Sequence, residues 1–140
     1  MASSAIRSVI IEAIDPRQMR YRTAGDWFFK EVGDELCIQV ADLGDWRYNC
    51  LVAIHELIEV LLCTNAGISQ KLVDRFDFAH EDEDDPGSHP EAPYQKEHLI
   101  AMGIEMMLAA SLDIQWRTYA DAIEKVLEQT PRTPRKNPKP

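Results

Sequence analysis

Three side chains that could do chemistry lie within one strongly apolar stretch of the chain. His55, Glu56 and Glu59 are set among Leu, Ile, Val and Ala residues. A helix of this composition is expected to be buried, and an ionised carboxylate buried without a partner costs several kcal/mol. Because residues four apart lie on the same face of a helix, His55 and Glu59 can bind one common atom. The pattern therefore predicts a site at which something compensates the buried carboxylates.

A second apolar stretch carries a matching set, His98 and Glu105, which share a helix face because they are seven apart. Two such helices packed together could present His55, Glu59 and His98 to one divalent ion. This ligand set suits Zn²⁺ first, and also Mn²⁺ or Fe²⁺, and it leaves coordination positions open. Glu105 is expected either as a fourth ligand or as a partner that orients His98. Glu56, about 100° around the helix from His55, would be the base that activates water.

The run His55-Glu56-Leu57-Ile58-Glu59 resembles the zinc-binding helix of the zincin metallopeptidases. In that motif two ligands one turn apart hold the metal, and the Glu after the first ligand activates water. As in that family, a segment expected as a strand, 35–41, precedes the helix. The sequence departs from the family at Glu59, where the motif has its second His. The resemblance implies a metal-dependent hydrolase that acts on a peptide or amide bond, with Glu56 as the catalytic residue.

A wider resemblance covers most of the chain and is to small proteins encoded by phages and prophages. The segments that carry it are Gly25-Asp26-Trp27, Asp42-Leu43-Gly44-Asp45-Trp46-Arg47-Tyr48, the stretch from His55 to Cys63, and Ala92-Pro93-Tyr94 with Glu97-His98. This resemblance implies a phage or prophage origin and carries no particular activity.

Two other functions stay open from the residues alone. Glu56 and Glu59 could join Asp74, Asp77 or Glu97 in holding Mg²⁺, as in the all-helical nucleotide pyrophosphohydrolases, which the chain resembles only at the Glu56-x-x-Glu59 step. Alternatively, the chain is a non-enzymatic phage protein that binds a host factor. In that case any metal is structural, and the acidic run 81–85 acts as an electrostatic decoy.

The elements that must position these residues are strands followed by helices, which defines an α+β fold. The segments 26–31 and 35–41 are expected to form a hairpin around Gly33-Asp34, within an antiparallel sheet of two or three strands. The segment 6–14 is the possible third strand, although it also fits a helical period.

Four helices are expected. The first spans about 46–65, the second follows a cap at Ser69 and reaches about 79, the third spans 93–112 and the fourth 114–129. Asp45 is placed to cap the first helix and Gly67 to close it. The fourth helix is amphipathic. The third is apolar nearly all round, and we expect both it and the first to be buried.

The acidic, proline-containing segment 81–92 is expected to be a flexible, solvated loop within a single domain, 1–130. His80 and His89 flank its acidic run and could bind metal weakly, although a solvated linker is the favoured interpretation. The basic, proline-rich residues 131–140 are expected to form a disordered tail.

Composition limits the partners. The chain has 140 residues, 45% of them hydrophobic, and a formal net charge of -9 from 15 basic and 24 acidic residues. This charge disfavours binding to nucleic acid. The zincin resemblance implies a peptide or small-molecule substrate, and a host protein is the alternative partner. No apolar run approaches the ~20 residues that cross a bilayer, and the N-terminus resembles no secretory signal. A cytosolic location, in the host if the chain is phage-encoded, and three reduced thiols at Cys37, Cys50 and Cys63 are therefore predicted.

Overall fold

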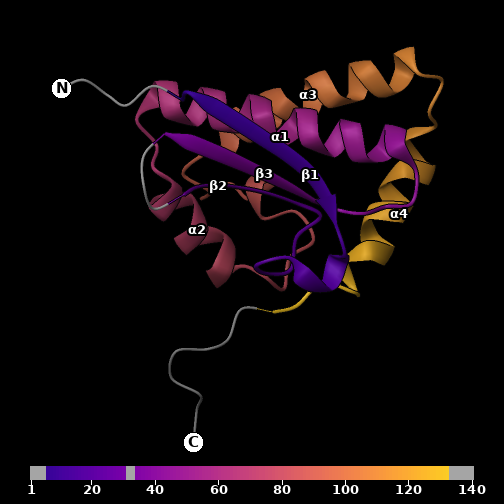
Figure 1. Ribbon diagram of the computed structural model, residues 1–140, viewed down its shortest axis with the longest axis horizontal. Helices are drawn as coiled ribbons and strands as arrows, with labels where there is room; N and C mark the ends of the chain where they lie inside the picture. The colour runs from indigo at the N-terminus through magenta and orange to yellow at the C-terminus, as the bar shows by residue number, and fades with distance from the viewer. Residues whose placement is uncertain (1–5, 31–33, 133–140) are drawn as a thin grey trace, which may run out of the picture.

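A computed structural model describes residues 6–30 and 34–132 of the chain, and it has the predicted α+β fold (Figure 1). A three-stranded sheet at the N-terminus is followed by four helices. In chain order the elements are β1 Ser8–Ile14, the short 3₁₀ helix η1 Pro16–Gln18, β2 Gly25–Phe29, β3 Glu35–Ala41, α1 Trp46–Ala66, α2 Gln70–Ala79, the short 3₁₀ helix η2 Pro86–Ser88, α3 Gln95–Ser111 and α4 Trp116–Leu127.

The sheet is mixed, which corrects the expectation of an antiparallel one. Its strand order is β1-β3-β2, and β2 pairs with β3 as the predicted antiparallel hairpin, with Trp27 opposite Ile38. The turn residue Gly33 lies outside the described residues. The first segment is a strand, but β1 runs parallel to β3, with Ile11 opposite Ile38. Local pattern predicts a strand but not its partner, because a parallel neighbour is reached only through an intervening crossover.

The helix that carries the first His and Glu residues begins and ends where its capping residues predict. The Asp45 side chain accepts a hydrogen bond from the Arg47 backbone N–H, and Gly67 ends α1 in the left-handed conformation with φ of 75°. By length and composition alone α1 could cross a membrane. In this fold its inner side packs on β2 and β3 and contributes Leu51 and Val60 to the core, together with the three ionisable residues of the predicted site.

The remaining helices follow the predicted order, and α3 lies alongside α1 (Figure 1). The Ser69 hydroxyl accepts a hydrogen bond from the Leu72 backbone N–H and so caps α2. On α4, Tyr119 and Leu127 are buried, while Trp116 and Ile123 are only partly buried against the core. This pairing of α1 and α3 is what brings the two predicted His and Glu sets together.

The acidic segment 81–92 is joined to the body of the protein by hydrogen bonds, while its residues 82–85 stay exposed. Arg22 donates hydrogen bonds to the backbone carbonyls of Glu81 and Glu83 and to the Asp84 carboxylate. Within the segment, η2 forms a turn in which Gly87 is buried. A cation from the β1–β2 connection therefore compensates the like charges. Of the predicted tail, Arg132 pairs with Asp82, and residues 133–140 lie outside the described residues.

Candidate metal centre

The predicted ligands from the two helices meet at one place in the interior. His55 and Glu59 on α1 and His98 on α3 are all buried. Their facing atoms form a nearly equilateral triangle: His55 Nε2 lies 3.2 Å from Glu59 Oε2 and 3.1 Å from His98 Nδ1, and His98 Nδ1 lies 2.9 Å from Glu59 Oε2. Ligand atoms bound to one tetrahedral zinc ion at about 2.0–2.1 Å lie about 3.3 Å apart. The triangle therefore has nearly the dimensions of one face of a tetrahedral zinc site, which leaves the fourth position open.

The Nε2 atom of His55 faces this triangle, and the other nitrogen of that ring is held by Glu105. Glu105 Oε1 lies 2.7 Å from His55 Nδ1, and Glu105 Oε2 accepts a 2.6 Å hydrogen bond from the Tyr119 hydroxyl. A carboxylate at Nδ1 favours the tautomer with its proton on Nδ1, which leaves Nε2 free to bind a metal. Glu105 was predicted as a fourth ligand or as the partner of His98. It lies instead behind His55 and is not one of the three residues of the triangle.

His98 has a carboxylate behind it as well, and it comes from the acidic segment. Asp85 Oδ1 lies 2.8 Å from His98 Nε2, although Nε2 lacks an aligned hydrogen bond, so the contact is an ion pair. The segment can come this close because of Gly87, where a Cβ would lie 2.5 Å from His98 Cγ. Sequence reasoning missed Asp85, since a carboxylate within an acidic run resembles solvated surface. The one local signal was the Pro86-Gly87 pair, which marks a tight turn.

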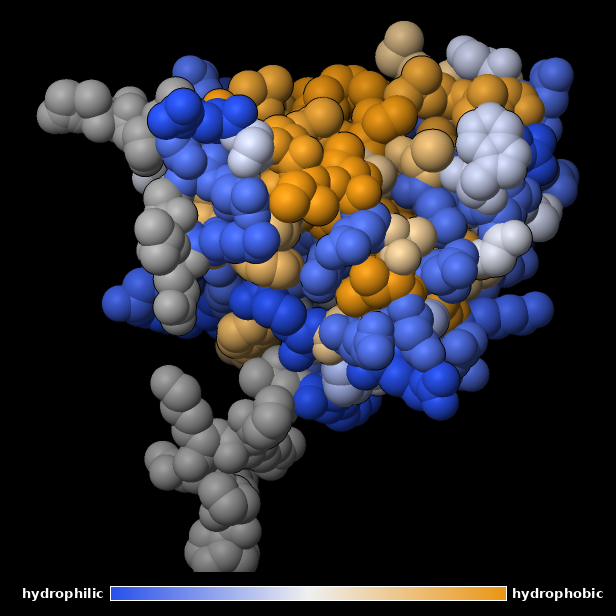
Figure 2. All heavy atoms as spheres, viewed as in Figure 1, coloured by the Kyte–Doolittle hydropathy of each residue, from blue (hydrophilic) through white to orange (hydrophobic). Residues whose placement is uncertain are grey.

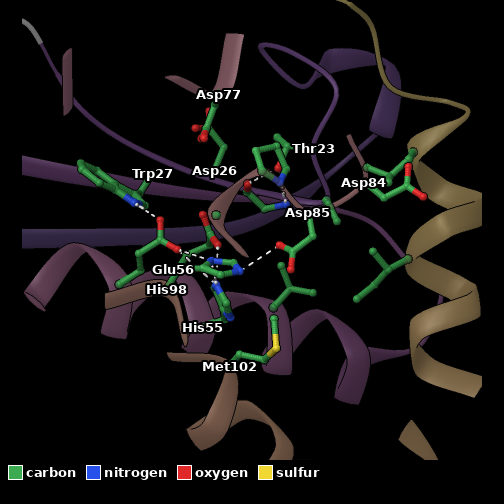
Figure 3. A pocket seen from close by; sticks show the side chains of 18 of the residues that line it. Thr23, Asp26, Trp27, His55, Glu56, Asp77, Asp84, Asp85, His98 and Met102 are labelled. Atoms are coloured by element: carbon green, nitrogen blue, oxygen red, sulfur yellow. Dashed lines mark hydrogen bonds and ion pairs between the residues drawn. The ribbon is translucent and has the colours of Figure 1, made fainter. Parts of the chain in front are cut away.

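The third ligand, Glu59, is oriented from the sheet. Its Oε1 accepts a 3.0 Å hydrogen bond from the indole N–H of Trp27 on β2, while Oε2 faces the two imidazoles. Figure 3 shows Trp27 and Asp85 approaching the site from opposite sides. Each of the three candidate ligands thus has its far atom held by a separate neighbour, as is typical of metal sites with ordered ligands.

The electrostatics of the triangle favour a cation at its centre. Burial alone would lower the pKa of His55, but Glu105 and Glu59 raise it to about 11, and Asp85 and Glu59 likewise outweigh burial to raise the pKa of His98 to about 9. Burial alone would raise the pKa of Glu59, but hydrogen bonds from the two imidazoles lower it to about 2. Without a metal the site therefore holds protons between its donor atoms, and a divalent ion would take their place.

Glu56 lies next to the triangle and, unlike Glu105 and Asp85, holds neither imidazole by a close contact. It is buried, its Oε2 lies 3.9 Å from His55 Nε2, and among the described residues it has no hydrogen-bond partner. Burial and the nearby Glu59 raise its pKa well above the usual value. Gly25 of β2 leaves it room, since a Cβ there would lie 2.9 Å from Glu56 Cγ. A carboxyl group that directly follows a candidate ligand, about 100° around the helix from it, is where a general base is needed.

The site opens into a cavity of about 330 Å³ between β2, α1, α3, α4 and the acidic segment. Met102 of α3 and Trp116 and Ile123 of α4 give the cavity an apolar part, and Asp84 and Asp85 of the acidic segment also line it. Figure 3 shows Met102, Asp84 and Asp85 around the site. A pocket with one apolar wall and a few convergent polar groups is typical of small-molecule and peptide sites.

Two of the other predicted acidic residues, Asp74 and Asp77, contact partners of their own. Asp77 lines the cavity and accepts hydrogen bonds from the hydroxyls of Tyr21 and Tyr94, and burial raises its pKa to about 7. Asp74 shares Arg20 with Asp26, whose carboxylate accepts 2.7 and 2.9 Å hydrogen bonds from that guanidinium. These groups therefore offer no second pair of free carboxylates for Mg²⁺ beside Glu56 and Glu59.

A second group of possible ligands, His80, Glu83 and His89, lies at the end of α2. His89 Nδ1 accepts a hydrogen bond from the Glu91 backbone N–H, which places the proton of a neutral imidazole on Nε2. That ring therefore lacks a free lone pair, and the group fits a preformed metal site less well than the buried one. The three cysteines are free, as predicted, and Cys63 lies in the core outside the triangle.

Comparison of the chain with protein-family models, with curated proteins and with solved structures gave no match. The site itself therefore carries the functional argument.

Proposed function

We propose that this protein is a metal-dependent hydrolase with a zincin-like site that acts on a peptide or amide bond. The observation that carries the proposal is the triangle of His55 Nε2, Glu59 Oε2 and His98 Nδ1, whose edges of 2.9 to 3.2 Å suit one ion. Zinc is the first choice because a set of two imidazoles and one carboxylate, with positions left open, is typical of its catalytic sites. Manganese and ferrous iron accept the same set.

The roles of the residues follow from their surroundings. When bound, the metal ion would polarise the scissile carbonyl and lower the pKa of water at the site. Glu56 is free of hydrogen bonds to described residues, and its raised pKa suits a group that takes a proton from water and passes it to the leaving amine. The apolar wall around Met102 and Trp116 would bind an apolar part of the substrate.

The test uses the full chain purified without a histidine tag and loaded with Zn²⁺, Mn²⁺ or Fe²⁺. We expect one ion per chain, loss of binding in His55→Ala and His98→Ala, and cleavage within a mixed peptide library read by mass spectrometry. Glu56→Gln should keep the ion and lose cleavage by 10²-fold or more, because it removes the base and leaves the ligands in place. A folded protein that binds none of the three ions would overturn the proposal.

A purely structural metal is the second candidate, and one observation favours it: the three ligands join α1 to α3, so an ion there would hold the two helices together. In that case Glu56→Gln would have no catalytic effect, and all coordination positions would be filled by protein atoms. The non-enzymatic phage protein that binds a host factor belongs to this candidate. Phage origin and a cytosolic location stay predictions.

The Mg²⁺-dependent pyrophosphohydrolase is the weaker enzymatic alternative, because Asp74 is already paired with Arg20 and Asp77 with two tyrosines. Release of pyrophosphate from nucleoside triphosphates with Mg²⁺, by a chain that cleaves no peptide, would favour it over the proposal.

A further inference from the structure

The large apolar side chains that stay exposed gather on one part of the surface. Nearly all of those exposed by 40% or more belong to β1, α1, α3 or the end of α3, with Leu72 of α2 as the exception among the described residues. Figure 2 shows apolar surface concentrated on the upper part of the visible face, where Figure 1 places β1, α1 and α3. We call this surface the outer face and define it by Val9, Ile11, Leu61, Leu99, Ile100, Met106 and Met107; Ile10, between Val9 and Ile11, points to the opposite side of the sheet.

The outer face carries no charge along most of two helices. From Tyr48 to the end of α1, and from His98 to the end of α3, the only charged or imidazole side chains are the five that point inward to the site, and all five are buried. A helix that is apolar nearly all round is expected to be covered on all sides. Within one chain, the sheet and the site cover only the inner sides of α1 and α3. The prediction that α1 and α3 are buried is therefore confirmed for their inner sides, while their outer sides stay exposed.

We propose that a second copy of this chain covers the outer face, with α3 of one copy packed against α3 of the other. The face offers no charged group with which a charged partner could pair. The net charge of -9 opposes self-association in general, so two copies can meet only over a surface that brings no like charges together. A twofold contact also requires a surface that fits itself, which an uncharged apolar face does. A membrane fits less well, because helices that lie on membranes carry Lys and Arg along their polar sides.

The area and shape of the outer face suit a dimer. Side chains exposed by 42 to 71%, each of roughly 150–200 Å² in full, amount to roughly 600 Å² over the whole face, about three quarters of the ~800 Å² per partner of a stable interface. Gly103 lies on the exposed side of α3 between Leu99 and Met107, and a Cβ there would meet nothing within 4 Å. Two α3 helices can therefore approach closely at this residue. His98 and Glu105 lie on the other side of α3, so dimerisation leaves the metal site in place.

The experiment measures the mass of the full chain in solution by light scattering and by sedimentation, at tens of micromolar. We expect about twice the 16.0 kDa of one chain. Met107→Glu and Leu99→Glu should each weaken the dimer by at least ~100-fold, because the twofold symmetry buries two unpaired carboxylates for each substitution. The matched control is Leu72→Glu, which changes an equally apolar exposed residue of α2 and should leave the dimer intact.

Circular dichroism and metal content check that each variant is folded, independently of any activity. A wild-type chain that stays monomeric at these concentrations would overturn the proposal, whether or not it sediments with phosphatidylcholine vesicles. Sedimentation with vesicles would assign the outer face to a lipid surface instead. An oligomer that Met107→Glu and Leu99→Glu leave unchanged would also overturn it, because the contact would then lie elsewhere.

Discussion

Metal binding at the triangle should depend steeply on pH, because the ion has to displace protons. In the metal-free protein the pKa of His55 is raised to about 11 and that of His98 to about 9, so both imidazoles are protonated between pH 6 and 8. Binding needs both lone pairs and therefore releases up to two protons. Each released proton changes the apparent affinity tenfold per pH unit, so the dissociation constant should fall by up to ~100-fold per unit as the pH rises.

The assay is a titration of the metal-free chain with Zn²⁺ against a competing chelator from pH 6 to pH 8. Calorimetry in two buffers of different ionisation enthalpy counts the protons directly. His98→Gln is the matched variant: it leaves one titrating imidazole in the triangle, so the slope should fall to about tenfold per pH unit. An affinity that does not change with pH, or a release of much less than one proton, would refute the view that the two rings face each other across a shared cation.

Three further predictions concern the groups around the triangle. Glu105→Gln should weaken metal binding about 10–100-fold, measured by the same competition, because it removes the carboxylate that orients His55; equal affinity would show that the contact is incidental. Gly87→Ala places a Cβ against the ring of His98 and should lower the free energy of unfolding by about 1–3 kcal/mol in urea titrations, whereas unchanged stability would place the acidic segment away from the site. The metal-free protein should lose stability as the pH falls from about 4.5 to about 2, because the pKa of Glu59 is lowered in the folded state. In thermal unfolding measured over this pH range, Glu59→Gln should flatten the dependence of the melting temperature on pH, and an unaltered dependence would contradict the ion pairs.

The three candidate ligands could be predicted from the sequence because helix geometry fixes which residues share a face. The four-residue spacing of His55 and Glu59 places them on one face of α1, and burial of charged residues predicts that a second helix completes the site. His98 was identified by the same reasoning from α3. Glu105 was identified as part of the site, but its contact was assigned to the wrong imidazole, because the relative rotation and offset of two helices are not encoded in either helix alone.

The features that the sequence did not predict depend on long-range contacts. Asp85 reaches His98 only because Arg22, far away in the chain, holds the acidic segment and Gly87 lets it pack closely. Similarly, the pattern of 6–14 indicates a strand, while its parallel pairing with β3 depends on the crossover through η1. The outer side of α3 is the opposite case, since its all-round apolar pattern predicts more burial than one chain provides.

The most direct test of the central claim is anomalous X-ray diffraction from crystals grown with Zn²⁺, with data collected above and below the zinc absorption edge. We predict one strong peak bonded to His55 Nε2, Glu59 Oε2 and His98 Nδ1, with a position beside Glu56 that is not filled by protein atoms. A folded crystal with no peak at the triangle, or a peak whose coordination positions are all taken by protein atoms, would contradict the proposed catalytic metal centre.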